Sequence, residues 1–131
     1  MDFDVFSKQD WPGFKQTHSA STRVVMPDGS VVTGIARHTQ DMIAMFGYLP
    51  DLRVEEHSVK VAAGDWTAVV GRFTGTFSRP MPLPGGGSIP PTGKTVHMPM
   101  ATFARWEDGQ IAEEILFWDS GEFMKQLGLA Q

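Results

Sequence analysis

Apolar residues recur at helical spacing near the start of the chain. Asp10 precedes Trp11 and Pro12, an order typical of a helix that begins with a side-chain cap and a proline in its first turn. Phe14 and His18 then lie one turn apart on one face. The pattern predicts a helical first third of the chain, which ends before a turn formed by the sequence Met-Pro-Asp-Gly at 26–29.

A second helix is predicted from about Ile35 to Phe46. Its apolar stripe at helical spacing consists of Ile35, Thr39, Met42, Ile43 and Phe46. Thr33 is a suitable cap before this helix, and Gly47 is a suitable stop after it.

From Arg53 onward the pattern changes to the period of two that is typical of strands. Strand-like runs rich in β-branched and aromatic residues begin at Arg53, at Trp66 (to Phe77), at Val96 (to Trp106) and at Ile111 (to Asp119). Ser120 to Leu127 predicts a last helix that stops at Gly128. Helices followed by a strand meander and a helix predict a single α+β domain over residues 1–131, with an antiparallel sheet.

The last two strands are joined by Glu107-Asp108-Gly109-Gln110, a strong hairpin turn. With a three-residue loop, His97, Phe103 and Arg105 share a face with Asp119, whereas a two-residue loop moves His97 to the other face. Alternation along the last strand predicts that Phe117 and Asp119 point into the fold, with Leu116 and Trp118 outward.

A proline-rich segment lies between the middle strands, at 79–94, and fits either a lid over a pocket or an ordinary decorated hairpin. It ends in Pro-Thr-Gly-Lys-Thr, which resembles the end of a phosphate-binding loop. The required glycine five residues before Gly93 is replaced by Ser88, and a strand-like run follows in place of a helix. We therefore reject nucleotide binding.

Composition narrows the class of protein further. Cysteine is absent, which removes disulfides and thiol chemistry and favours a cytoplasmic location. The acidic start lacks the features of a signal peptide, and no apolar run approaches the ~18 residues of a membrane span. The net charge of −4 with scattered basic residues argues against a nucleic-acid partner.

Eight Met, nine Phe and four Trp stand beside a single Tyr. Most of these residues are expected in the core, and some are expected to line a cavity for an apolar ligand. The candidates are Trp11, Met42, Met45, Phe46, Trp66, Phe73, Met98, Met100, Phe103 and Phe117. The four histidines, His18, His38, His57 and His97, form no close ligand pair, so no metal site is predicted.

Asp119 follows an apolar strand segment, where lost solvation raises the pKa of a carboxyl group toward that of a general acid or base. It also precedes the last helix, so it could equally serve as an N-cap. From the local sequence alone the cap is the favoured interpretation.

Eight short segments, taken in their order along the chain, change the balance between these two interpretations of Asp119. They are PDG, GI-x-x-H, PDLRV, GDWTAVVG, GTF, PTGK, RWEDGQIAEE and FWDSGEFMKQLGL. Together they resemble the SnoaL-like polyketide cyclase family of the nuclear transport factor two-like superfold, from about Pro27 to Gly128.

The resemblance implies a cone-shaped α+β barrel: a curved antiparallel sheet wrapped around an apolar pocket that N-terminal helices close, usually in a homodimer. Members with known chemistry close rings by an intramolecular aldol reaction without metal or cofactor, using an acidic residue at the position of Asp119. After His18 this chain has Ser-Ala-Ser, where many relatives place an acid. The superfold also includes isomerases, dehydratases, hydrolases and binding domains, so fold alone does not determine function.

We therefore predict a cofactor-independent enzyme that performs aldol-type cyclisation or isomerisation on a small hydrophobic carbonyl compound, as a homodimer through the outer sheet face. The alternatives are a non-catalytic protein that binds an apolar ligand, and a small hydrolase or dehydratase. The predicted catalytic residues are Asp119, His97 and His38. The predicted ligand-binding residues are Trp11, His18, Met42, Phe46, His57, Phe73, Met100, Phe103, Arg105 and Phe117.

Overall fold

The computed structural model describes residues 3–129, so the ends of the predicted domain, 1–2 and 130–131, lie outside the described residues. The helices are α1 (Phe3–Ser7), α2 (Trp11–Thr17), α3 (Ile35–Tyr48) and α4 (Ser120–Gln126). The strands are β1 (His18–Val25), β2 (Val31–Thr33), β3 (Arg53–Ala63), β4 (Trp66–Thr76), β5 (Met81–Pro82), β6 (Ser88–Ile89), β7 (Thr95–Glu107) and β8 (Gln110–Phe117).

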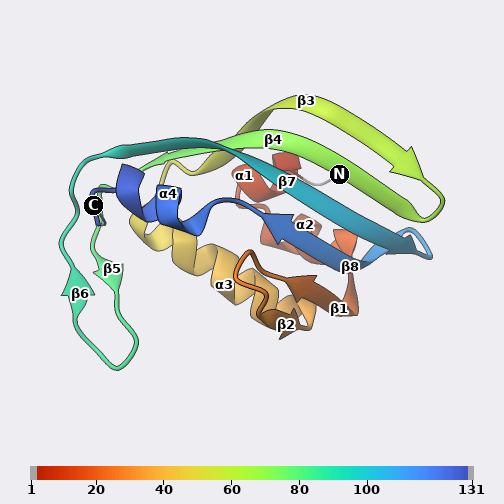
Figure 1. Ribbon diagram of the computed structural model, residues 1–131. Helices are drawn as coiled ribbons and strands as arrows, with labels where there is room; N and C mark the ends of the chain where they lie inside the picture. Colours follow the sequence, from red (N-terminus) through yellow and green to blue (C-terminus); the bar gives the residue numbers. More distant parts are fainter. Residues whose placement is uncertain (1–2, 130–131) are drawn as a thin grey trace.

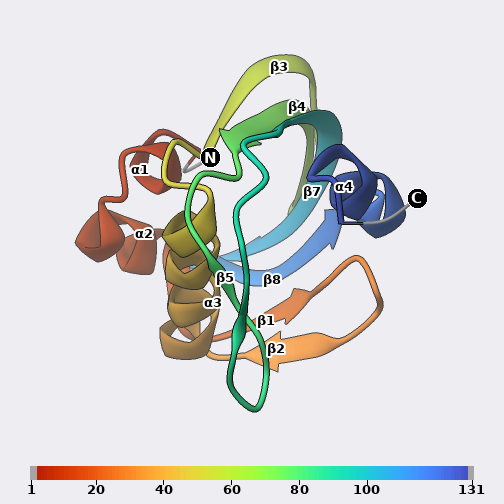
Figure 2. The ribbon, with the colours of Figure 1, turned by 90° about the vertical axis from the view of Figure 1, so that its left-hand side faces the viewer.

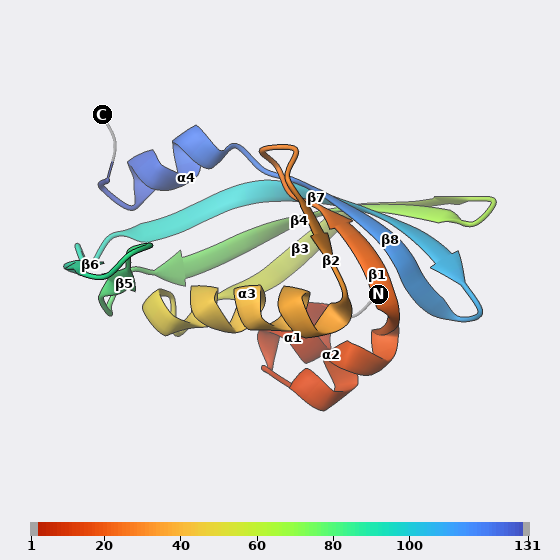
Figure 3. The same cartoon turned by 90° about the horizontal axis from the view of Figure 1, so that it is seen from below.

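Six of the strands form one curved sheet in the order β2-β1-β8-β7-β4-β3 (Figure 1). Helices α1, α2 and α3 lie on its concave face, as the end-on view in Figure 2 and the view from below in Figure 3 show. The predicted α+β class, with N-terminal helices against a curved sheet, is confirmed. Among the described residues, no helix combines the length and the apolar character needed to cross a membrane.

Two details of the predicted sheet are wrong. The sheet is mixed, because β1 pairs parallel with β8 and antiparallel with β2. It is also open, because its ends, β2 and β3, do not pair with each other, so it does not close as a barrel.

The parallel strand comes from a segment that was predicted to be helical. Helix α2 begins as expected: Asp10 is its N-cap, and the Gly13 N–H donates to Asp10 Oδ1 at 3.1 Å. It ends at Thr17, however, and the next eight residues form β1. Thr22 and Val24 are buried on alternate positions of that strand, so strand periodicity and β-branched residues override the short helical spacing.

Helix α3 keeps part of its predicted stripe, because Thr39, Met42 and Phe46 are buried, but Ile43 is 45% exposed and the predicted ends are wrong. Thr33 is the last residue of β2, and Gly34, with a φ of 96°, takes the N-cap position without a side-chain hydrogen bond. The helix also continues through Gly47 to Tyr48. Its stripe is buried against the sheet, through His38, Thr39, Met42 and Phe46.

The β7–β8 hairpin has the two-residue loop. Glu107 pairs with Gln110, and Asp108 and Gly109 both have positive φ, at 52° and 77°, as type I′ turns require. One residue later β8 contains a bulge: Trp106 pairs with Ile111 and Arg105 pairs with Glu113, which leaves Ala112 without a partner.

The bulge reverses the alternation of side chains along β8. Ile111 is buried before it, and Glu114 and Leu116 are buried after it, while Phe117 is 52% exposed. The prediction that Phe117 points inward and Leu116 outward is therefore wrong, because simple alternation carried across a bulge inverts the faces.

The proline-rich segment forms the small β5–β6 hairpin, which projects beyond one end of the main sheet near α4 (Figure 1). Its Met81 and Ile89 pack against the core, so the structure has the decorated hairpin. The C-terminal part of this segment is hydrogen-bonded to the end of the last helix, since the Thr92 hydroxyl donates to the Leu127 carbonyl oxygen at 2.6 Å.

Candidate functional site

A cavity of about 60 Å³ lies between the helices and the concave face of the sheet. Its walls are mostly apolar. The lining residues come from all three N-terminal helices and from the inner sheet face: Phe6, Phe14, His38, Met42, Met45, Leu52, Val54, Phe73, Met100, Thr102, Glu114, Leu116 and Trp118. The predicted apolar pocket thus has a counterpart in the structure, at the place where ligand sites in such folds are expected.

Only three of these lining residues carry polar side chains, and all three are buried. His38 is 2% exposed, Thr102 is 3% exposed and Glu114 is 5% exposed. Polar groups that converge in an otherwise apolar cavity are the usual mark of a site for chemistry or specific recognition.

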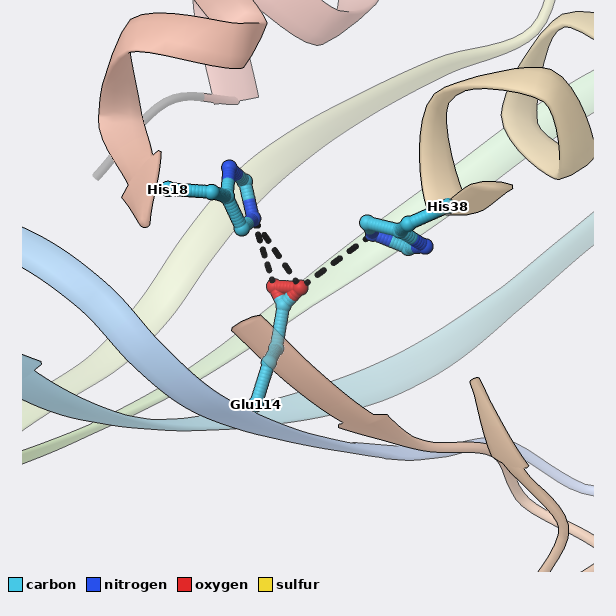
Figure 4. Close-up of side chains that lie close together, drawn as sticks. All are labelled: His18, His38 and Glu114. Atoms are coloured by element: carbon cyan, nitrogen blue, oxygen red, sulfur yellow. Dashed lines mark hydrogen bonds and ion pairs between the residues drawn. The ribbon is translucent and has the colours of Figure 1, made fainter. Parts of the chain in front are cut away.

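Glu114 lies between two buried histidines, as Figure 4 shows. Both of its oxygens are 3.5 Å from Nε2 of His18, and Oε1 is also 3.5 Å from Nε2 of His38. These separations exceed the ~2.7–3.2 Å of a well-formed N–H···O bond. The three residues come from β1, α3 and β8, so tertiary structure alone assembles them.

The partners of His18 determine which ring nitrogen carries a proton. The Thr17 hydroxyl donates to the Phe14 carbonyl oxygen at 2.7 Å, so its oxygen is available to accept. His18 Nδ1 lies 2.8 Å from that hydroxyl and 3.1 Å from the same carbonyl oxygen, so Nδ1 carries hydrogen. Nε2 then faces a carboxylate, and this contact is attractive only when Nε2 also holds a positive group, a proton or a metal ion.

The histidines keep Glu114 ionised. Burial by itself would raise the pKa of the Glu114 carboxyl, but the hydrogen bonds and positive charge of His18 and His38 outweigh burial and lower that pKa from 4.5 to about 2. At neutral pH the cavity wall therefore carries a carboxylate that faces the two imidazoles.

His38 differs from His18 at Nδ1, the ring nitrogen that does not face Glu114. Its Nε2 faces Glu114, and its Nδ1 is buried and has no hydrogen-bond partner among the described residues. If Nε2–H donates to Glu114, Nδ1 holds an unoccupied lone pair. This is the arrangement in which a carboxylate orients a histidine to act as a base.

The same three residues could hold a metal ion. Their ligand atoms lie within 4.8 Å of one another, and two imidazoles with one carboxylate are a common ligand set for transition metals. The sequence shows no close pair of metal ligands because the three positions, 18, 38 and 114, are far apart along the chain.

Four of the predicted site residues line the cavity: His38, Met42, Phe73 and Met100. Three others lie behind its walls. Phe46 belongs to the core cluster, Trp11 packs edge-on against Phe14 and Phe46, and His18 contacts Glu114.

The remaining predicted residues lie outside the cavity lining. His57 is half-buried on β3, where its ring lies against Gly71. His97 is exposed. Phe103 and Phe117 form an exposed aromatic pair on the outer sheet face, with ring centroids 5.8 Å apart, and Arg105 forms ion pairs with Glu107 and Glu113. Phe103, Arg105 and Phe117 therefore share one face of the sheet, as predicted, but that face is the outer one, because the even-numbered residues of β7 are the buried ones.

Asp119 also lies outside the cavity lining. It is exposed and caps α4, where its Oδ1 accepts a hydrogen bond from the Glu122 N–H at 2.9 Å. The prediction that it points into the cavity is wrong, and the N-cap interpretation of the local sequence is confirmed. Asp119 instead borders a shallow outer groove with Phe117.

Sequence reasoning missed eight lining residues: Phe6, Phe14, Leu52, Val54, Thr102, Glu114, Leu116 and Trp118. A signal for Glu114 was present, because a carboxylate stands in an apolar strand beside Ile115 and Leu116. Its neighbour Glu113 has the same local context, so only the position of the bulge distinguishes the two.

Comparison with known proteins agrees with this architecture. The model of the SnoaL-like polyketide cyclase family matches residues 2–127. The chain belongs to the SnoaL-like polyketide cyclase family. No functionally curated protein matches the sequence.

Solved structures share the fold of this SnoaL-like protein. A protein from Jannaschia sp. CCS1 assigned to the SnoaL-like polyketide cyclases is 26% identical, with a TM-score of 0.83 over 99% of this chain and 88% of that one. IdmH from Streptomyces antibioticus, assigned as a polyketide cyclase, is 21% identical, with a TM-score of 0.81 over 97% and 93%. A Catenulispora acidiphila protein with a ketosteroid isomerase-like fold, bound to trimethylamine, is 15% identical, with a TM-score of 0.77 over 98% and 89%. The fold is therefore nuclear transport factor two-like.

Proposed function

We propose that this chain is a cofactor-independent enzyme that performs acid–base chemistry, an aldol-type cyclisation or an isomerisation, on a small hydrophobic carbonyl compound. The observation that carries the proposal is the buried pair of Glu114 and His38 in the wall of an otherwise apolar cavity. Family membership supports the class of chemistry, and the cavity lining supports an apolar substrate.

In the proposed first step, His38 takes a proton from the carbon next to the substrate carbonyl. The C–H bond breaks, its electron pair forms the enolate, and the proton goes to Nδ1 of His38. Glu114 orients the ring and stabilises the imidazolium, as the carboxylate of a catalytic triad does. His18 also faces Glu114 and helps to keep its carboxylate ionised.

The enolate then determines the reaction type. Attack of its carbon on a second carbonyl group of the same molecule forms a ring, and the new alkoxide recovers the proton from His38. Return of the proton to a different carbon gives an isomer. Either step leaves His38 neutral and ready for another cycle.

The test follows loss of the α-proton signals of cyclic ketones, beginning with cyclohexanone, by ¹H NMR in D₂O with enzyme present. Because His38 is the base and Glu114 its partner, His38→Gln and Glu114→Gln should each slow exchange by about 10²–10⁴. Asp119→Asn is the matched control, since Asp119 caps α4 outside the cavity. Its exchange rate should equal that of the wild type, and addition of EDTA should leave the wild-type rate unchanged.

Three results would contradict the proposal. Loss of exchange in Asp119→Asn with normal exchange in Glu114→Gln would return the acid–base role to Asp119. Ketone binding without any catalysed exchange would favour the non-catalytic alternative. An EDTA-sensitive rate that Zn²⁺ restores would show that His18, His38 and Glu114 work as metal ligands.

A further inference from the structure

Thr102 has a buried hydroxyl group that no described residue uses. The side chain lies on β7, is 3% exposed and lines the cavity. Its Oγ1 has no hydrogen-bond partner among the described residues. Because an unsatisfied buried hydroxyl costs free energy and is rare in native proteins, it points to a group that binds there.

The strand register places this hydroxyl beside the proposed base. On the inner face, Thr102 pairs with Leu116 and Ala104 pairs with Glu114. Thr102 and Glu114 are therefore diagonal neighbours on adjacent strands, with backbones roughly 7–8 Å apart. No bulge intervenes between these pairs, so both side chains point into the same cavity.

Apolar groups occupy the rest of the inner wall around these two points. Leu116 pairs with Thr102, and Met100, Trp118, Phe14 and Met42 line the same cavity. A ligand that fits this lining is a small, mostly hydrocarbon molecule. It places one oxygen at Thr102 and its reactive carbon toward His38 and Glu114.

We propose that Thr102 binds the carbonyl oxygen of the substrate through its hydroxyl group and thereby selects ketones and aldehydes over hydrocarbons of the same shape. The proposal deepens the proposed function, on which it rests, by naming the recognised group. A hydroxyl donor at this position also strengthens its bond as negative charge moves onto the oxygen during enolate formation.

The experiment compares two probes of nearly equal shape, cyclohexanone and methylenecyclohexane, which differ by a carbonyl oxygen in place of a terminal CH₂. Their affinities are measured by NMR titration of the wild type, Thr102→Val and Thr102→Ser. Valine has the shape of threonine, is favourable in a strand and leaves no polar atom unsatisfied, so the fold is retained.

We expect the wild type and Thr102→Ser to prefer cyclohexanone, and Thr102→Val to lose about three- to tenfold of its affinity for cyclohexanone while that for methylenecyclohexane is unchanged. Equal wild-type affinities, absence of ketone binding at millimolar concentration, or a preference that survives Thr102→Val would each overturn the proposal.

Binding and proton exchange distinguish this proposal from the proposed function. If Thr102→Val loses the ketone preference while no variant catalyses exchange, the oxygen site stands and the acid–base function fails. If exchange requires Glu114 but the ketone preference survives Thr102→Val, the function stands and the role of Thr102 fails.

Discussion

The carboxylate of Glu114 is only 5% exposed, and such a buried charge needs an explanation. An isolated charge in an apolar wall would neutralise itself by a raised pKa. Glu114 instead stays ionised because two imidazoles face it. Such an arrangement is sensitive to removal of either partner, since a single change leaves a buried charge without its counterpart.

The pKa of Glu114 predicts how stability depends on pH. Its folded-state pKa of about 2 lies below the unfolded value of 4.5, so the unfolded chain binds the proton first. The stabilising contribution is present above pH 4.5 and is lost as the pH falls toward 2. Urea unfolding at pH 6 and at pH 3 should show a loss in the wild type of about 2 kcal/mol more than in Glu114→Gln. An equal loss in both proteins would mean that Glu114 is not held ionised.

At the scale of elements, the bulge in β8 controls which side chains reach the cavity. Ala112 has no partner in β7, so the alternation of faces restarts at Glu113. Without the bulge, Glu113 would take the inner position and Glu114 would face solvent. A single unpaired residue thus separates a buried carboxylate, that of Glu114, from a surface ion pair between Glu113 and Arg23.

Helix α4 depends on Asp119 for its start. Asparagine can accept the same hydrogen bond from the Glu122 N–H, so Asp119→Asn should change the free energy of unfolding little. Asp119→Ala removes the acceptor and should cost about 1 kcal/mol. Thermal unfolding of the two variants checks this. Equal destabilisation by Asn and Ala would show that the cap does not depend on the hydrogen bond.

For the whole molecule, the two faces of the sheet have different roles. The concave face holds the cavity, and the outer face carries two apolar rows across β3, β4, β7 and β8. By register, the rows are Val59, Val70, Ala101 and Phe117, and Val61, Ala68, Phe103 and Ile115. Large exposed apolar patches mark interfaces, so the predicted homodimer remains our proposal for this face, now through these residues in place of Leu116 and Trp118.

We expect the wild type to elute as a dimer in size-exclusion chromatography with light scattering at micromolar concentration. Phe117→Glu should shift it to a monomer, because the change places a charge within the apolar rows. Gln40→Glu, on the exposed side of α3, is the matched control and should remain dimeric. A monomeric wild type would refute the interface.

Local patterns were sufficient for much of this architecture. Asp10 and Asp119 as caps, most of the stripe of α3, the β7–β8 turn and the four long strands each depend on neighbours in sequence, so they could be predicted from it. The family resemblance, and with it the curved sheet under N-terminal helices, was also available from the order of short segments.

Only the tertiary structure determined the site. His18, His38 and Glu114 meet because β1 pairs with β8 and α3 crosses the sheet, and no local spacing encodes that meeting. The bulge at Ala112 assigned Glu114 to the cavity and Phe117 to the outside, because face assignment in a strand depends on every residue between the turn and the position concerned. Secondary structure follows from local periodicity, whereas a site built from three separate elements follows from how those elements pack.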